Sequence, residues 1–268
     1  MKWYTALSSH SSEDYIKMLN VAVYSCLKNT PFKPHIICDE RNIYTSQLKD
    51  KYKDNITVVY HKGKIFESFC DQFKNDKSLV NQLGTAGAYL RAEIPMVEED
   101  DKYVLYTDTD VLFFNPRNGP QNIPAPKYFA AAPEFEATNW SYFNSGSMII
   151  NVDNMREKYN EFHDFVVPRF RELINHAHDQ AAYNHLFLDK WDRLPVEYNW
   201  KPGWGINKSA VVVHFHGPKP TDIEAYFNSS LDEVNIDVPV DGLSLYKQMI
   251  ERNTESNRYY LDQYNEYT

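Results

Sequence analysis

The sequence predicts an α/β protein with a mainly parallel central sheet flanked by helices. Residues 3–60 alternate between short β-branched or aromatic runs and segments in which apolar residues have helical spacing, as expected for parallel strands joined by helices. A further buried strand is predicted at residues 103–107, directly before two acidic residues. Hydrophobic residues make up 43% of the 268 residues, which is ample for a core. Sheets of this kind bind ligands beyond the carboxyl ends of their strands, so we expect a site at that edge.

The N-terminal part is predicted to run strand, helix, strand, helix, strand. Its first helix opens with Glu13 and Asp14, acids that interact favourably with the positive end of a helix, and Pro31 ends it because proline cannot continue a helix. The predicted strands cover residues 3–7, 35–38 and 56–60, and the predicted helices cover residues 13–30 and 44–52.

The chain up to residue 220 continues the alternation with longer loops. Residues 62–77 are predicted to mix loop and helix, residues 84–94 to form a helix that Pro95 ends, and residues 116–126 to form a surface excursion. Strands are predicted at residues 128–132, 143–152 and 210–213, and the second of these opens with an Asn-Ser-Gly turn. Asp153 is expected to cap a helix that runs towards residue 170 with an interruption at Pro168, and another helix is expected to run from His178 to about residue 188. Residues 201–205 are predicted to form a loop with an aromatic tip.

The two acids after the strand at residues 103–107 are candidates for a metal site. In an extended chain, successive side chains alternate in direction, so Asp108 and Asp110 leave the chain on the same side while Thr109 points away. Two such carboxylates suit Mg²⁺ or Mn²⁺, whose other positions can be filled by water and substrate phosphate. A solvated turn at the end of a strand is the alternative interpretation of the same residues.

Composition and charge argue against several classes of protein. The formal net charge of −9 disfavours sequence-independent nucleic-acid binding, which needs Lys and Arg to neutralise phosphates. No apolar run approaches the roughly 20 residues of a membrane span, and the first residues lack the apolar segment of a secretory signal, so we expect a cytoplasmic protein without a transmembrane segment. Cys26, Cys38 and Cys70 are unclustered and odd in number, which indicates reduced thiols rather than a disulfide framework or a cysteine-based zinc site.

Four short motifs stand in order at predicted element boundaries. They are the Asp108-Thr109-Asp110 pair, Asn144-Ser145-Gly146, Asp179-Gln180 at a helix start, and His214-Phe215-His216-Gly217 followed by Lys219. In this order the motifs resemble those of the family 8 glycosyltransferases, retaining enzymes that include glycogenin and bacterial lipopolysaccharide galactosyl- and glucosyltransferases. The resemblance covers residues 4–220 and implies the GT-A fold, a nucleotide-binding α/β domain.

The resemblance also implies a metal centre. Asp108 and Asp110 match the family's metal-binding Asp-x-Asp, and His214 matches its third protein ligand. Imidazole beside two carboxylates favours Mn²⁺ over Mg²⁺, which stays possible. His216 is a rival ligand, because alternation along a strand would put it on the same side as His214.

Further residues match family positions at the donor and the reacting sugar. The resemblance implies that a UDP-sugar donor, including its uridine, diphosphate and sugar parts, is contacted by Ala6, Leu7, Ser8, Tyr15, Arg91, Asp108, Ser145, Gly217 and Lys219. It implies catalytic positions at Asn144, Asp179 and Gln180. One departure concerns Lys219, since only Pro218 separates it from Gly217 where the family usually has two residues.

Structural interpretations of three of these residues remain open at this point. Arg91 is equally compatible with a surface position on a helix, Tyr15 with core packing on the first helix, and Asp179 with an N-cap. Glu134, Trp140 and Tyr142 precede Asn144 and either contact an acceptor or pack in the core.

The function that the resemblance implies is metal-dependent retaining transfer of a hexose, glucose or galactose, from a UDP-sugar to a hydroxyl acceptor. The acceptor would be a glycan, a lipid-linked sugar or a protein hydroxyl. A sugar nucleotidyltransferase and a catalytically inactive nucleotide-sugar-binding protein are the alternatives.

The last part of the chain differs in composition from the rest. Residues 221–268 hold ten acidic and three basic residues and are rich in tyrosine. We therefore expect a GT-A domain at residues 1–220 and an acidic extension at residues 221–268 that packs on it.

Overall fold

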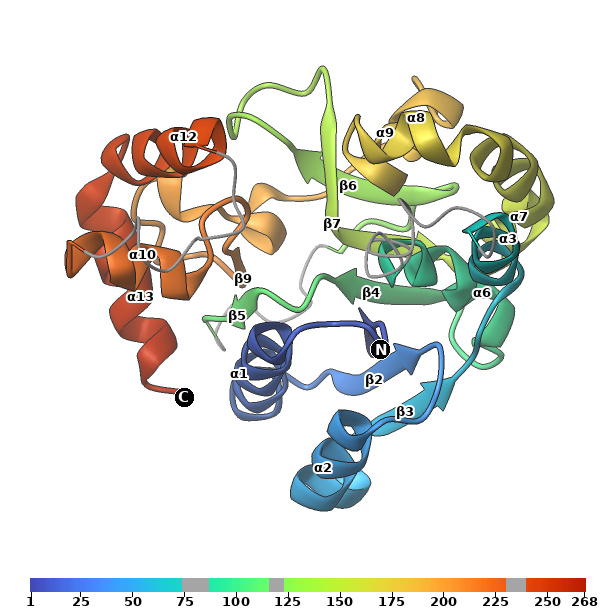
Figure 1. The fold of residues 1–268 in the computed structure, drawn as a ribbon, viewed down its shortest axis with the longest axis horizontal. Helices are drawn as coiled ribbons and strands as arrows, with labels where there is room; N and C mark the ends of the chain where they lie inside the picture. Colours follow the sequence, from blue (N-terminus) through green and yellow to red (C-terminus); the bar gives the residue numbers. More distant parts are fainter. Residues whose placement is uncertain (74–86, 116–122, 230–239) are drawn as a thin grey trace.

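The computed structural model describes residues 1–73, 87–115, 123–229 and 240–268. In this part of the chain, seven strands form a central sheet in the order β3-β2-β1-β4-β7-β6-β8 (Figure 1). The strands of this sheet are β1 (Lys2–Leu7), β2 (Lys33–Cys38), β3 (Thr57–Tyr60), β4 (Tyr103–Thr107), β6 (Phe129–Pro133), β7 (Phe143–Asn151) and β8 (Asp192–Arg193). A separate two-stranded sheet contains β5 (Val111–Phe113) and β9 (Val212–His214).

The central sheet is parallel except around β7. β1 pairs in parallel with β2 and β4, β2 pairs in parallel with β3, and β6 pairs in parallel with β8, whereas β7 runs antiparallel to both β4 and β6. The predicted α/β class with a mainly parallel sheet is therefore confirmed. All nine residues of β7 are buried, which fits a central strand covered on both faces.

Helices lie on both sides of the central sheet (Figure 1). The α-helices are α1 (Glu13–Asn29), α2 (Ile43–Tyr52), α3 (Lys64–Phe73), α6 (Ile94–Val97), α7 (Val152–Val166), α8 (Phe170–Ile174), α9 (His178–Leu186), α10 (Pro220–Phe227), α12 (Val240–Glu251) and α13 (Thr254–Asn265). Short 3₁₀ segments are η1 (Lys53–Asn55), η2 (Gly87–Glu93), η4 (Val167–Arg169), η5 (Val196–Asn199) and η6 (Pro202–Trp204). Within the described residues, no helix combines the length and apolar character that crossing a membrane demands.

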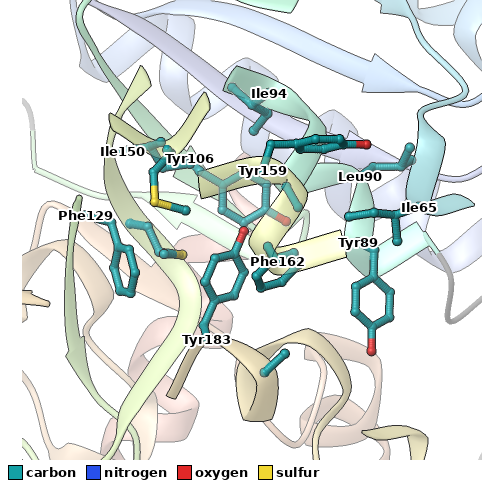
Figure 2. Packing of buried hydrophobic residues seen from close by; sticks show 14 of the residues in the cluster. Ile65, Tyr89, Leu90, Ile94, Tyr106, Phe129, Ile150, Tyr159, Phe162 and Tyr183 are labelled. Carbon is teal, nitrogen blue, oxygen red and sulfur yellow. The ribbon is translucent and has the colours of Figure 1, made fainter. Parts of the chain in front are cut away.

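Aromatic packing fills the layer between the sheet and helices α3, α7 and α9. Figure 2 shows Tyr183 of α9 between Phe129 of β6 and Phe162 of α7. The ring centroids of Tyr183 lie 5.6 Å from Phe129 and 4.5 Å from Phe162, close enough for favourable aromatic contact. This packing holds α9, whose start carries two candidate catalytic residues, against the edge where β4 ends and β7 begins.

The C-terminal helices share a hydrophobic cluster with the small sheet. Tyr260 and Leu261 of α13 and Ile250 of α12 are buried together with Leu112 of β5 and Val213 of β9. Figure 1 shows α10, α12 and α13 gathered beside β5 and β9. The described residues of α10, α12 and α13 thus pack against the preceding chain, while the division of the chain into a domain and an extension at residue 220 stays a prediction.

Several local predictions are wrong, and each has a physical reason. Pro95 does not end a helix but lies in the first turn of α6, where a missing backbone N–H costs nothing. The N-cap of α7 is Asn151, whose side chain accepts from Asn154 N, and Asp153 lies in the first turn. Asn144 does not open a turn, because residues 144–146 belong to β7 beside a register shift in β6. Residues 84–86 and 116–122 of the predicted helix and excursion lie outside the described residues.

Candidate active site

Backbone hydrogen bonds place the acid pair at the carboxyl end of β4. Asp108 N donates to Gly146 O of β7 at 2.9 Å, and Phe215 N donates to Asp110 O at 2.9 Å. The chain bends between these acids instead of staying extended, and β5 then pairs with β9 so that Val111 lies opposite His214. Main-chain contacts therefore bring His214 beside two acids that precede it by about a hundred residues in the sequence.

Asp108, Asp110 and His214 form a cluster that could hold a divalent cation. One ligand atom from each residue lies within 4.8 Å of the others. His214 Nε2 lies 3.3 Å from Asp110 Oδ1 and 3.9 Å from Asp108 Oδ2. A Cβ at Gly146 would overlap His214 Cε1 and lie 2.7 Å from Asp108 Oδ2, so glycine is needed to leave this space. Two carboxylates and an imidazole suit Mn²⁺, and the residues fit such an ion.

A partly buried ion pair adjoins this cluster. Lys219 Nζ lies 2.5 Å from Asp110 Oδ2. Burial alone would raise the pKa of Asp110, but the charge of Lys219 and the contact with His214 outweigh burial and hold the pKa well below its ordinary value. Burial likewise opposes the charge of Lys219, yet Asp110 raises the pKa of this lysine above its ordinary value. Both groups are therefore charged at neutral pH.

Arg91 links the acid pair to Asp179. Its guanidinium places Nη2 2.9 Å from Asp108 Oδ1 and Nε 2.9 Å from Asp179 Oδ2. Nη1 donates to the carbonyl oxygen of Ser145 and, at 3.0 Å, to its hydroxyl, while the guanidinium carbon lies 4.6 Å from the centre of the Tyr106 ring. Arg91 is only 5% exposed, so its interpretation as a surface residue is wrong.

Asp179 lies in the first turn of α9 and does not cap it. The N-cap position is Ala177, which has a left-handed φ of 69°, and no side-chain cap bond forms there. Burial raises the pKa of Asp179 to about 6, against the opposing effect of the Arg91 charge. A buried carboxyl with a pKa near neutrality is typical of functional sites.

A chain of hydrogen bonds sets the proton position on His214. Gly146 N, which can only donate, bonds to Asn144 Oδ1 at 2.9 Å, so that atom is the acceptor. Asn199 Nδ2 donates to the same oxygen at 2.9 Å, which turns Asn199 Oδ1 towards His214 Nδ1 at 2.8 Å. Because an amide oxygen can only accept, Nδ1 carries a proton, and Nε2 is the nitrogen that faces Asp108 and Asp110 and could bind a cation between them.

Asn144 and Gln180 converge on Glu134. Asn144 Nδ2 donates to Glu134 Oε2 at 2.7 Å, and Gln180 Nε2 donates to the same oxygen at 3.2 Å. Gln180 Oε1 accepts from Ser145 N at 2.9 Å and from Asn144 Nδ2 at 3.1 Å. The candidate catalytic amides are thus fixed in orientation by groups that surround them.

A cavity of about 590 Å³ opens over this network. The sequence-predicted residues that line it are Ala6, Leu7, Ser8, Tyr15, Arg91, Asp108, Asp110, Asn144, Ser145, Asp179, Gln180 and Lys219. Tyr15 is 43% exposed, so interpreting it as a core residue is wrong. The volume is in the range of small-molecule sites.

Two predicted residues do not line this cavity. His214 is 1% exposed and lies behind the acid pair. Gly217 has a φ of 85°, which favours glycine, and a Cβ there would overlap the end of Met249 of α12. The close approach at Gly217 is therefore to α12.

Three residues of the site were missed or misjudged from the sequence. Tyr106 donates its hydroxyl to Asp108 Oδ1 at 2.7 Å, and strand alternation could have indicated it, because it lies two residues before Asp108. Asn199 is a lone asparagine in η5, and no pattern marks it. His216 turns its Nε2 to Glu134 Oε1 at 3.2 Å rather than joining the metal-site cluster, because β9 ends at His214 and alternation stops there.

A strand-end Asp-x-Asp and a histidine beside a cavity at the carboxyl edge of an α/β sheet form a site that could bind a phosphorylated ligand through a divalent cation. Residues 6–220 match the model of glycosyl transferase family 8, and the chain belongs to this family.

Relatives and solved structures agree with this family. Glycosyltransferase GlyB of Streptococcus pneumoniae serotype 4 is 27% identical over 209 residues, which cover 72% of this chain and 47% of the relative. Glucoside xylosyltransferase 1 of Gallus gallus is 24% identical over 225 residues, covering 71% of this chain and 50% of the relative. The chain thus spans about half the length of these relatives. A crystal structure of the galactosyltransferase LgtC with donor and acceptor sugar analogs superposes with a TM-score of 0.62 at 18% identity, covering 90% of this chain and 98% of that one, which shows the GT-A fold.

Proposed function

We propose that this protein is a metal-dependent, retaining glycosyltransferase that moves a hexose, glucose or galactose, from a UDP-sugar to a hydroxyl of a glycan, a lipid-linked sugar or a protein. The observation that carries the proposal is the convergence of Asp108, Asp110 and His214. These residues would hold Mn²⁺, or Mg²⁺, and the bound ion would act as a Lewis acid towards the diphosphate of the donor.

The positive side chains near the acid pair would bind the donor phosphates. Lys219 contacts Asp110 through a flexible stem, so its ammonium can turn from that carboxylate to a phosphate oxygen. Arg91 is held rigidly between Asp108 and Asp179, where it supplies a fixed positive charge beside the sugar. The uridine would lie along Ala6, Leu7, Ser8 and Tyr15 of the cavity, with Ser145 also contacting the donor.

In the reaction, the bond between the anomeric carbon and the diphosphate oxygen breaks and a bond to the acceptor oxygen forms. The acceptor hydroxyl gives its proton to the departing diphosphate, and UDP leaves. Asn144, Asp179 and Gln180 line the cavity where the sugar would lie. Hydrogen bonds with Glu134 and Ser145 hold the two amides in place, and the ion pair with Arg91 holds Asp179. We assign these residues to orienting the sugar and stabilising its positive charge in the transition state.

Donor binding and slow donor hydrolysis test this proposal without an acceptor. UDP-glucose, UDP-galactose and UDP-xylose, the last because one relative is named a xylosyltransferase, are mixed with the protein and Mn²⁺, Mg²⁺ or EDTA. Thermal stabilisation and UDP release are then measured. We expect both to require the metal, and Asp108→Asn to lose at least 100-fold of the UDP release, roughly the effect of removing one charged group from an electrostatic site.

The exposed Asp164→Asn serves as the matched control, since Asp164 lies on α7 away from the cavity. Metal-dependent UDP release by Asp108→Asn at the wild-type rate would overturn the metal assignment. Diphosphate release from a nucleoside triphosphate would instead indicate a sugar nucleotidyltransferase, and donor binding without any UDP release would indicate an inactive binding protein. Once an acceptor is found, the anomeric configuration of the product, measured by NMR, tests retention.

A further inference from the structure

A second cavity continues from the active-site cavity. Its volume is about 380 Å³, and Glu134 and His216 line both cavities. Its walls carry Phe135, Trp204, Leu245 and Met249, and we call this cavity the apolar groove. Phe135 is 58% exposed and Leu245 is 54% exposed, so two large apolar side chains face solvent on the same concave surface. Such a surface next to a reaction centre marks a binding site.

The walls of the apolar groove are held in position before any ligand binds. Trp204 Nε1 donates to Phe135 O at 2.9 Å, which joins two walls. Lys201 Nζ lies 4.9 Å from the centre of the Trp204 ring. Met249 packs where a Cβ of Gly217 would stand, which fixes α12 against the chain that follows His216. Little ordering is therefore needed on binding, which favours affinity.

The wall that α12 contributes lies outside the part of the chain that matches the family model. Leu245 and Met249 lie outside residues 6–220, the part that matches the family. Membership in the family therefore assigns no role to them, and the groove must be interpreted from its own chemistry.

The polar groups at the floor already bind one another. Lys201 Nζ donates to the carbonyl oxygens of Pro133, at 3.1 Å, and Glu134. The carboxylate of Glu134 accepts from Asn144 and Gln180 through Oε2 and pairs with His216 through Oε1. Glu136 and Arg252 also line the groove, but both are exposed to solvent. A second sugar ring at the floor would therefore give up water around several hydroxyls with little replacement there, which is unfavourable. An apolar group has no hydroxyls that would lose hydrogen bonds to water, and it would cover Phe135 and Leu245.

We propose that the apolar groove binds an apolar aglycone of the acceptor, so that the acceptor is a sugar carrying an alkyl-like group beside the reacting hydroxyl. This inference rests on the proposed glycosyl transfer, because the acceptor sugar would lie at Glu134 and His216 where the two cavities meet. The aglycone extends from there between Trp204 and Leu245.

A series of alkyl glycosides tests the inference by equilibrium binding. Methyl, butyl and hexyl β-glucosides and β-galactosides are titrated against the protein with Mn²⁺ and UDP, and binding is followed by ligand-observed NMR. Each buried methylene is expected to raise the affinity about threefold to fourfold. Hexyl glycosides should therefore bind at least tenfold more tightly than methyl glycosides, allowing for incomplete burial.

A pair of leucine variants locates the effect. Leu245→Asp places a charge in the apolar groove and should remove the gain of the hexyl over the methyl glycoside. Leu188→Asp changes a leucine that is 63% exposed and lines neither cavity, so the gain should persist. An affinity that does not rise with chain length, no binding of any member of the series, or an equal gain in Leu245→Asp overturns the inference. Tighter binding of lactose than of the hexyl glycosides also overturns it, in favour of a second sugar. UDP release from the donor alone, measured on the wild-type protein, tests the proposed function separately.

Discussion

The side chain of Asn199 offers a direct test of how the candidate metal site is set up. It is fully buried and makes two hydrogen bonds in the described structure, one to His214 Nδ1 at 2.8 Å and one to Asn144 Oδ1 at 2.9 Å. Asn199→Leu keeps a similar volume but removes the acceptor of the Nδ1 proton. The proton is then free to move to Nε2, which lies 3.3 Å from Asp110 Oδ1.

The size of the effect follows from this alternative proton position. A hydrogen bond from a protonated Nε2 to a carboxylate contributes about 1.5–3 kcal/mol, and the protonated nitrogen has no lone pair left to bind a cation. Groups that orient a metal-binding histidine typically change metal affinity by about 10- to 100-fold. We therefore expect Asn199→Leu to weaken Mn²⁺ binding by that factor, measured without donor by the EPR signal of free Mn²⁺.

A matched control separates this effect from loss of stability. Asn151 is also a buried asparagine with two hydrogen-bond partners, but it lies at the far end of β7. Asn151→Leu should lower the free energy of unfolding without changing the Mn²⁺ affinity. Wild-type Mn²⁺ affinity in Asn199→Leu, or ¹⁵N NMR showing the proton of wild-type His214 on Nε2, would refute the reasoning.

Three further predictions concern neighbouring residues. Gly146→Ala puts a methyl group where His214 lies, so it should abolish Mn²⁺ binding and lower the free energy of unfolding by about 1–3 kcal/mol. Mn²⁺ titration and thermal unfolding measure the two effects, and unchanged Mn²⁺ binding would contradict the prediction. Lys219→Met frees Asp110 from its ion pair, so in calorimetric titrations Mn²⁺ alone should bind more tightly while UDP binds more weakly. A change of both affinities in the same direction would count against this prediction. Burial raises the pKa of Asp179 to about 6 in the folded protein, above its ordinary value. The protonated carboxyl therefore contributes its full stabilisation of the fold below pH 4, and this contribution is lost as the pH rises through 6. The stability of Asp179→Asn relative to the wild type should therefore rise by about 3 kcal/mol between pH 4 and pH 7 in urea unfolding, and a pH-independent difference would disprove this.

The regular helices and strands could be predicted because the spacing of apolar residues along the sequence indicates which side chains are buried. Helix α1 was predicted from apolar residues at helical spacing, and it begins at Glu13 as expected. Helix boundaries were harder to predict where two residues competed for one role. Asn151 and Asp153 both suit an N-cap, and only the packing of β7 against β4 decides that the strand ends at Asn151.

Residues of the candidate site could be predicted only where neighbouring residues in the sequence form a recognisable motif. Asp108 and Asp110 stand out as a pair, but their approach to His214 depends on the pairing of β5 with β9, which no periodicity reveals. The resemblance to a family supplied that link. Asn199 and the pairing of Glu134 with His216 depend on the tertiary structure alone, because each is one polar residue in an irregular segment.

The ladder between β5 and β9 has a consequence for how this family can diverge. Val111 is paired with His214, and Phe113 with Val212, through main-chain hydrogen bonds that do not depend on side-chain identity. Apolar replacements along both strands would leave the spacing of the acidic and imidazole groups intact. Inserting or deleting one residue in either strand would shift the pairing register and move His214 away from the two acids. In related enzymes we therefore expect the residues of β5 and β9 to vary while the lengths of the two strands stay the same. An alignment would then show this requirement as a lack of gaps in the two strands rather than as conserved residues.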